Sequence, residues 1–112
     1  MGAEPFEDDL AAEAIAAGTG VKNDTGKLRM SLLPEGTLKV VLRVLEFGAQ
    51  KYAPGNWQKV ADARRRYYDA LHRHAEAWWT GEINDPETGE HHLASVVCCA
   101  LFLIWFDLRG TK

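Results

Sequence analysis

An uninterrupted apolar run, LASVVCCALFLIWF at residues 93–106, limits the possible folds of this chain more strongly than any other segment. A membrane-spanning helix needs about 20 such residues. The run has only fourteen, between EHH on one side and DLRG on the other. We therefore interpret residues 91–108 as a buried helix. Because this helix is apolar nearly all round, other helices must cover it on more than one side.

Two amphipathic helices are predicted upstream of this run. One begins near Pro34, since proline is favoured at the first helical position, and continues to about residue 52. The other covers about residues 62–80 and ends at Gly81. One face of it is formed by Tyr67, Leu71, His74, Ala75 and Trp78. Three helices of this length cannot cover the apolar helix alone. The sequence therefore predicts an all-α fold, a bundle of antiparallel helices that is completed by homo-oligomerisation as a dimer or tetramer.

The chain divides into an acidic N-terminal appendage, residues 1–20, and a single helical domain, residues 21–112. Five acidic residues and no basic residue lie in the first thirteen positions, so this end lacks the basic region of a secretory signal. The formal net charge of −3 gives no sign of a nucleic-acid polymer as partner. Cys98 and Cys99 are adjacent, which disfavours a disulfide between them. Two reduced cysteines are typical of a cytoplasmic protein, and we expect no membrane partner.

Residues 72–92 hold all four histidines of the chain. His74 lies in the apolar face of its predicted helix and His92 in the first turn of the next one, so both face inward. Glu82 and Asp85 lie on the connection between these helices. The four side chains form a mixed nitrogen and oxygen set that suits Mg²⁺ or Mn²⁺, or a softer transition metal. Glu82 also follows a helix C-terminus, where a carboxylate opposes the helix dipole, which indicates a cation nearby.

The same residues have structural interpretations that stay open. A single inward histidine such as His74 is usually a hydrogen-bonded core residue. Asp85 in DPETG can bond its own backbone and form a turn. His72 and Glu76 are an i, i+4 pair on the outer helix face, which typically adds a few tenths of a kcal/mol of helix stability.

Basic and aromatic residues around two turns predict a nucleotide site. Lys27 and Arg29 follow DTG and can hold phosphates, the arginine by bidentate contacts. Tyr52 and Trp57 offer faces on which a purine base can stack, and Asn56 offers an amide, although both rings suit a core equally well. Single basic residues are usually solvated. The nucleotide-binding candidates are Lys27, Arg29, Lys51, Tyr52, Asn56, Trp57 and Arg73.

Four segments together carry a resemblance to a known family. They are NDTGKLRMSLLP, FGAQKYAPGNWQKV, RRYYDALHRHAEAWWTGEINDPETGEHHLAS and CALFLIWFDLRG, within residues 22–110. In this order they resemble the phage-type dATP/dGTP diphosphohydrolase N-terminal domain family, which is similar to the MazG-like, all-α nucleoside triphosphate pyrophosphohydrolases. The resemblance implies a MazG-like helical bundle in the cytoplasm of a phage-infected or bacterial host cell. The sequence differs from the family pattern at Ser95, where the family commonly has a histidine.

The resemblance implies hydrolysis of a purine (deoxy)nucleoside triphosphate, of the dGTP or dATP type, to a monophosphate and pyrophosphate with Mg²⁺ or Mn²⁺. It assigns metal binding to Glu82, Asp85, His92 and His74, and catalysis to His74, Glu82 and Asp85. His74 or Glu76 would act as general base, and the basic residues would stabilise the phosphates. The alternative is a non-catalytic nucleotide-binding or helical interaction module.

Overall fold

The computed structural model describes residues 18–110, and the chain separates into two compact units, Met1–Met30 and Ser31–Lys112. In the first unit, the described residues contain a turn in which the Lys27 amide donates to the Asp24 carbonyl at 3.0 Å. The Asn23 side chain accepts from the Thr25 amide at 3.2 Å in the same turn. The predicted acidic appendage lies largely outside the described residues, and the predicted domain division stays a prediction.

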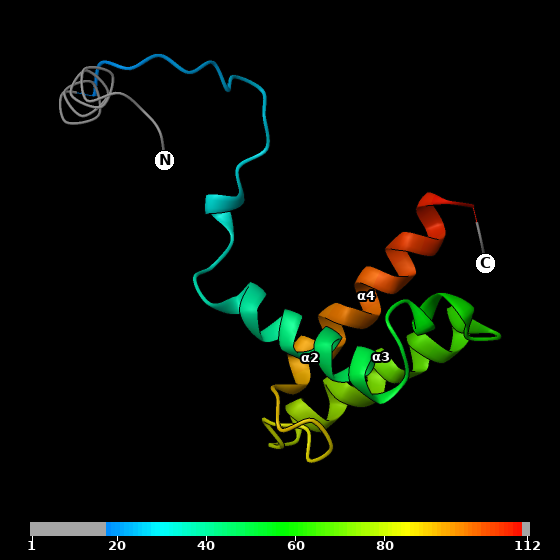
Figure 1. Ribbon diagram of the computed structural model, residues 1–112. Coiled ribbons are helices and arrows are strands. Elements are labelled where there is room, and N and C mark those ends of the chain that lie inside the picture. The colour runs from blue at the N-terminus through cyan, green and yellow to red at the C-terminus, as the bar shows by residue number, and fades with distance from the viewer. Residues whose placement is uncertain (1–17, 111–112) are drawn as a thin grey trace. The chain divides into compact units, whose positions relative to one another are not determined.

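The second unit consists of helices. A 3-10 turn, η1 (Met30–Leu32), begins at the last residue of the first unit, and α2 (Thr37–Lys51), η2 (Asn56–Lys59), α3 (Ala63–Trp79) and α4 (His92–Leu108) follow along the chain, as Figure 1 shows. In residues 18–110 the only strand-like feature is an isolated bridge between Asn84 and His91. The predicted all-α class is therefore confirmed. No helix among the described residues combines the length and apolar content needed to cross a bilayer.

The helix boundaries follow local backbone chemistry. The prediction that the first helix begins near Pro34 is wrong, because Gly36 has a φ of 82° and α2 begins after it, at Thr37. Instead, the Pro34 carbonyl accepts hydrogen bonds from the Thr37 amide (3.3 Å) and hydroxyl (2.7 Å). The predicted ends of α3 and α4 agree with the structure to within one or two residues. His91 caps α4, since its Nδ1 accepts from the Leu93 amide at 3.0 Å.

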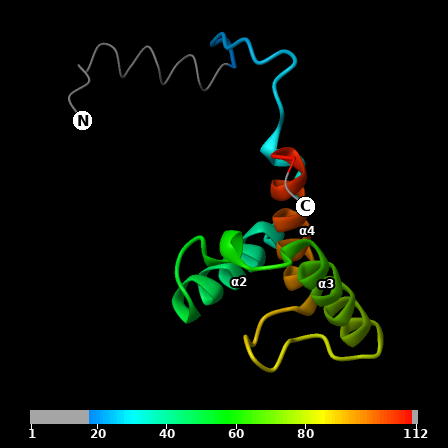
Figure 2. The ribbon, with the colours of Figure 1, turned by 90° about the vertical axis from the view of Figure 1, so that its right-hand side faces the viewer.

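Helix α4 is the centre of the second unit, with α2 on one side and α3 on the other (Figure 2). It runs antiparallel to α3, because His92 meets His74 near the connecting loop while Phe102 meets Tyr67 two to three turns away. Towards α2, a small core forms from Val41, Ala94 and Cys98. The predicted antiparallel pairing of the second and third helices is thus present.

The turn η2 covers the C-terminal half of α4 with one aromatic side chain. The Trp57 ring stacks on Phe102, with 4.5 Å between centroids and 14° between planes. It also meets Trp105 and Phe106 edge-on, at 5.0 and 5.9 Å. Aromatic contacts of this kind add roughly 0.5–1.5 kcal/mol each beyond the area they bury. Trp57 therefore fixes the segment between α2 and α3 against α4.

One face of α4 stays uncovered in a single copy of the chain. Its large apolar side chains are between two-fifths and four-fifths exposed: Val97, Leu101, Ile104 and Leu108. The sequence pattern predicted a helix that is apolar nearly all round, and the structure agrees. Completion of the bundle by homo-oligomerisation stays a prediction.

Candidate functional site

His74 from α3 and His92 from α4 meet at the end of the helix pair nearest the connecting loop. Their Nδ1 atoms lie 2.8 Å apart, which is hydrogen-bond distance. The side chain of His92 is only 6% exposed, and that of His74 is 25% exposed. The structure therefore brings together the two histidines that the sequence pattern turned inward.

The loop between α3 and α4 adds two carboxylates, one beside each histidine. Glu82 Oε1 lies 2.7 Å from His92 Nε2, and Asp85 Oδ2 lies 3.9 Å from His74 Nδ1. His92 and Asp85 thus approach the same atom of His74, Nδ1, while Glu82 lies at the other ring nitrogen of His92. Glu82 is half exposed and Asp85 is 13% exposed.

The loop conformation explains how these acids reach the helices. The His92 amide donates to the Ile83 carbonyl at 2.8 Å, and the Asp85 amide donates to the Glu90 carbonyl at 2.8 Å. Asp85 Oδ1 accepts from the Glu87 amide at 2.9 Å, so Asp85 does form the predicted turn. Its other oxygen, Oδ2, faces His74. Asp85 can therefore form the turn with Oδ1 and still offer Oδ2 to a metal ion.

Three of these residues form a group that can hold a metal ion. His74, Asp85 and His92 each offer one ligand atom, and the three atoms lie within 4.8 Å of one another. Ligand atoms about 2.1 Å from one octahedral ion are roughly 3.0 Å apart when adjacent and roughly 4.2 Å when opposite. The separations of 2.8 and 3.9 Å fit such an arrangement after small shifts.

The surroundings of His74 favour its neutral form. Burial lowers the pKa of His74 below its ordinary value, and the nearby His92 and Arg73 lower this pKa further. Asp85 opposes them and raises the pKa, but burial is the larger effect. At neutral pH the ring therefore keeps an unprotonated nitrogen, which is what either a metal ligand or a proton acceptor needs.

A cavity of about 1020 Å³ lies beside this group and extends along α2, η2, α3 and α4. It is large enough for a nucleotide, since small-molecule sites typically measure about 300–1,000 Å³. Seven of the predicted site residues line it: Lys51, Tyr52, Asn56, Trp57, Arg73, His74 and Asp85. Glu82 and His92 are not part of the lining. Lys27 and Arg29 belong to the first unit, and their part in a nucleotide site stays a prediction.

The two predicted stacking residues have different environments. One face of the Trp57 ring is taken by Phe102, which supports the core interpretation of this residue. Tyr52 is 63% exposed at the cavity, and the Lys51 ammonium lies 5.1 Å from its ring centroid. Tyr52 is therefore the more open of the two rings, and base stacking on it stays a prediction.

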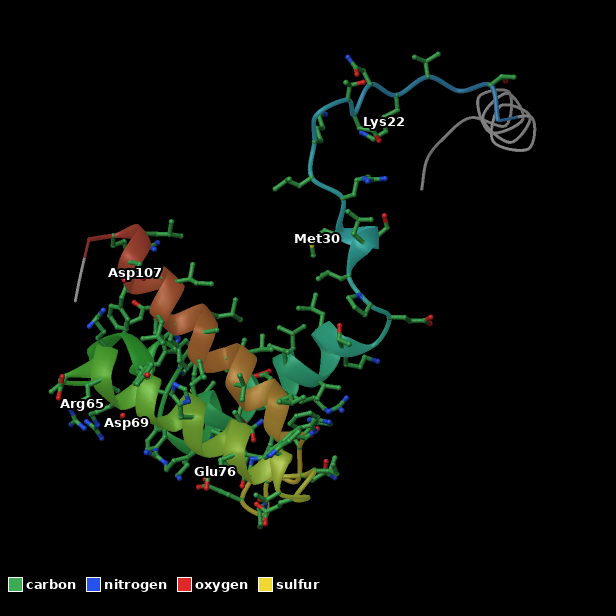
Figure 3. The ribbon with its side chains drawn as sticks, turned by 180° about the vertical axis from the view of Figure 1, so that it is seen from behind. Lys22, Met30, Arg65, Asp69, Glu76 and Asp107 are labelled. Carbon is green, nitrogen blue, oxygen red and sulfur yellow. The ribbon has the colours of Figure 1, made fainter. Side chains whose placement is uncertain are left out.

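Two ion pairs connect α2 to the loop that carries the acids. Lys51 pairs with Glu87, and Arg43 Nε donates to Glu90 Oε2 at 3.0 Å. Glu87 also lines the cavity, and no spacing in the sequence could have indicated this, because its partner Lys51 is 36 residues away. Glu76 lies on the outer side of α3 (Figure 3), as its position in the helical pattern predicted.

Comparison with known proteins places the chain in a family. The family described as dATP/dGTP diphosphohydrolase, N-terminal, matches residues 17–112, which include every helix of the described part of the chain and the loop of Glu82 and Asp85. A protein of Salmonella phage PMBT28 named dATP/dGTP diphosphohydrolase is 38% identical over 87 residues. The match covers 78% of this chain but 29% of that relative, so the chain spans less than a third of the relative's length. No solved structure shows a significant match. The resemblance predicted from the sequence is confirmed, and the chain belongs to the family of dATP/dGTP diphosphohydrolase N-terminal domains.

Proposed function

We propose that this domain hydrolyses a purine deoxynucleoside triphosphate, of the dGTP or dATP type, to a monophosphate and pyrophosphate with Mg²⁺ or Mn²⁺. The single observation that carries the proposal is the cavity of about 1020 Å³, which unites basic, aromatic and metal-ligand side chains from four helical segments. Family membership and the printed name of the phage relative support the same reaction class.

The cavity offers separate regions for the parts of a nucleotide. Lys51 and Arg73 supply positive charge for the phosphates, and an arginine can bind two phosphate oxygens at once. Tyr52 supplies an exposed ring for the base, and Asn56 supplies a neighbouring amide. In this arrangement the triphosphate extends towards His74 and Asp85.

His74, Asp85 and His92 are the residues that would hold the metal ion. A divalent ion there would neutralise phosphate charge and lower the pKa of an attacking water. His74, kept neutral by burial, has a lone pair with which to bind the ion or accept a proton. Glu76 is on the outer side of α3 and does not line the cavity, so we assign it no part in the reaction (Figure 3).

We also infer that the domain forms a MazG-like bundle by homo-oligomerisation. The exposed apolar side chains of α4 follow the spacing 97, 101, 104 and 108, which is the 4-3-4 pattern of a helix–helix seam. A second copy of α4 carries the same spacing and can cover this face.

A second candidate function is nucleotide binding without turnover. It is favoured by the observation that the chain spans only 29% of the phage relative, so the relative's named activity can reside in its remaining part. In that case the cavity would bind the nucleotide without cleaving it.

Measurement of pyrophosphate release separates the two candidates. The full chain is incubated with dGTP, dATP and other triphosphates, with Mn²⁺ or Mg²⁺, and pyrophosphate and monophosphate are quantified. The proposed reaction predicts release that Asp85→Asn reduces at least tenfold and that the control Glu76→Gln leaves unchanged. Nucleotide binding without release would contradict the enzyme and support the binding module.

A further inference from the structure

We propose that Glu82 lies outside the metal centre and holds His92 in the tautomer that binds the ion. The inner ligands are then His74, His92 and Asp85. The inference rests on the proposed function, because it concerns the metal of the same cavity. It changes the predicted role of Glu82 from a metal ligand to a positioning residue.

The contact between Glu82 and His92 fixes the position of one proton. The 2.7 Å contact between His92 Nε2 and Glu82 Oε1 suits a hydrogen bond in which Nε2–H donates and the carboxylate oxygen accepts. In the tautomer that makes this bond, the single ring proton is on Nε2, and Nδ1 on the other side of the ring offers its lone pair.

The unprotonated nitrogen of His92 faces the other candidate ligands. His92 Nδ1 lies 2.8 Å from His74 Nδ1, which is itself 3.9 Å from Asp85 Oδ2. Asp85 Oδ1 is already engaged by the Glu87 amide, so Oδ2 is the oxygen available to an ion. An ion bound by these atoms would replace the hydrogen bond between the two histidines. His74 Nδ1 carries the proton of that bond, so this proton would have to move to Nε2 before His74 could bind the ion.

Glu82 cannot join this ligand set while it bonds His92. The two nitrogens of an imidazole point to different sides of the ring, so an ion at Nδ1 is separated from a carboxylate at Nε2 by the ring itself. Metal-bound histidines commonly donate their second N–H to a carboxylate, which orients the ring, and loss of that partner typically lowers metal affinity about 10- to 100-fold.

The remaining ligand set indicates which metals bind. Two imidazole nitrogens and one carboxylate oxygen suit Mn²⁺, Co²⁺ and similar transition metals. Mg²⁺ prefers oxygen ligands and keeps several waters. The full chain should therefore bind Mn²⁺ and Co²⁺ more tightly than Mg²⁺, with His74 as a ligand rather than as general base.

Metal binding without nucleotide tests this assignment. Co²⁺, Mn²⁺ and Mg²⁺ are titrated calorimetrically into the full chain and into Glu82→Gln, Glu82→Leu and the control Glu76→Leu, which removes the same charge from the outer side of α3. The visible absorption of bound Co²⁺ reports nitrogen ligation. Circular dichroism verifies that each variant keeps its helices.

We expect Glu82→Leu to weaken Co²⁺ binding at least tenfold and Glu76→Leu to leave it unchanged. Glu82→Gln should bind within a few-fold of the parent chain, because the glutamine oxygen still accepts from His92 Nε2. Equal loss in Glu82→Gln and Glu82→Leu would mean direct ligation and would overturn the proposal. Unchanged affinity in Glu82→Leu, or tighter binding of Mg²⁺ than of Co²⁺, would overturn it as well.

The outcome is distinguishable from failure of the proposed function. The expected affinity pattern without any pyrophosphate release would support the role of Glu82 and contradict hydrolysis. Pyrophosphate release, together with an unchanged metal affinity in Glu82→Leu, would support hydrolysis and contradict the role of Glu82.

Discussion

The pKa of the His74 imidazole depends on groups from α3, from α4 and from the loop between them. Arg73 precedes it on α3, His92 faces it from α4, and Asp85 approaches from the loop. Because burial contributes most, the lowered pKa of His74 follows chiefly from the packing of α3 against α4. Folding of the helix pair therefore keeps His74 neutral, as a metal ligand or base must be, down to a lower pH than in the unfolded chain.

Arg73 should matter for binding the triphosphate more than for the chemical step. It lines the cavity beside His74 and can contact two phosphate oxygens. For the proposed reaction, Arg73→Ala should raise KM for dGTP about tenfold with a smaller change in kcat, since a hydrogen bond to a charged group contributes about 1.5–3 kcal/mol. Steady-state kinetics test this. Arg64→Ala, on the same helix but outside this cavity, should leave KM unchanged, and an unchanged KM in Arg73→Ala would contradict the assignment.

The two cysteines should be unreactive in the folded protein. Burial raises the pKa of Cys98 to about 12 and that of Cys99 to about 11. At pH 8 fewer than about 1 in 100 of either thiol is therefore ionised, and the thiolate is the reactive form. Iodoacetamide labelling, followed by mass spectrometry, should be at least tenfold slower in the native protein than in denaturant. Equal rates would contradict the burial of these thiols.

The same raised thiol pKa values predict a loss of stability at high pH. Above about pH 9 the thiols of the unfolded chain lose protons while those of the folded chain keep them. The unfolded state then binds fewer protons, so the free energy of unfolding falls as pH rises from about 9 to 11. Thermal unfolding at several pH values measures this, and Cys98→Ala should make the fall shallower.

The loop between α3 and α4 contains backbone conformations with a positive φ, which are unfavourable for residues that carry a Cβ atom. Gly81 ends α3 with a φ of 112°, and Gly89 follows with a φ of 73° inside the turn of Asp85. These conformations let the chain turn back within about ten residues, so that Glu82 and Asp85 reach both histidines. The positions of the acids are therefore set by the two glycines as much as by the helices.

Two glycine substitutions should change stability in opposite directions. Gly81→Ala forces a Cβ into a φ of 112° and should destabilise the protein by about 1–2 kcal/mol. Gly48→Ala should stabilise it by about 0.5–1 kcal/mol, because Gly48 is inside α2 and nothing lies within 4 Å of an added Cβ. Chemical denaturation of the two variants measures both effects. A stabilising Gly81→Ala would contradict the strained turn.

The uncovered face of α4 bears on the oligomeric state of the protein. Leu101 and Ile104 are 44% and 53% exposed in the single chain, and a large apolar surface of this kind usually marks an interface. If a second copy covers it, Leu101→Glu combined with Ile104→Glu should convert the native oligomer to monomers, because two buried like charges repel. Size-exclusion chromatography with light scattering measures the mass. Glu76→Ala should leave the mass unchanged, and a parent chain that is already monomeric would contradict the proposed oligomer.

Much of the helical architecture could be predicted from the sequence alone. The ends of α3 and α4, their antiparallel pairing and the inward direction of His74 follow from local periodicity and turn residues, which act over a few positions of the chain. The start of α2 could not be predicted from the proline preference, because the backbone of Gly36 adopts a positive φ. Local rules therefore determined the elements and most of the candidate residues.

Only the tertiary structure decided which atoms these residues contact. The sequence placed Glu82 with the metal ligands and allowed Trp57 as a stacking ring, whereas packing directs Glu82 to the far nitrogen of His92 and covers one face of Trp57 with Phe102. Packing likewise brings the side chain of Glu87 to that of Lys51, which is 36 residues away in the sequence. The physical reason is that periodicity fixes the face on which a side chain lies. Which atom it meets depends on the crossing of the helices and the path of the loop, to which distant parts of the chain contribute together.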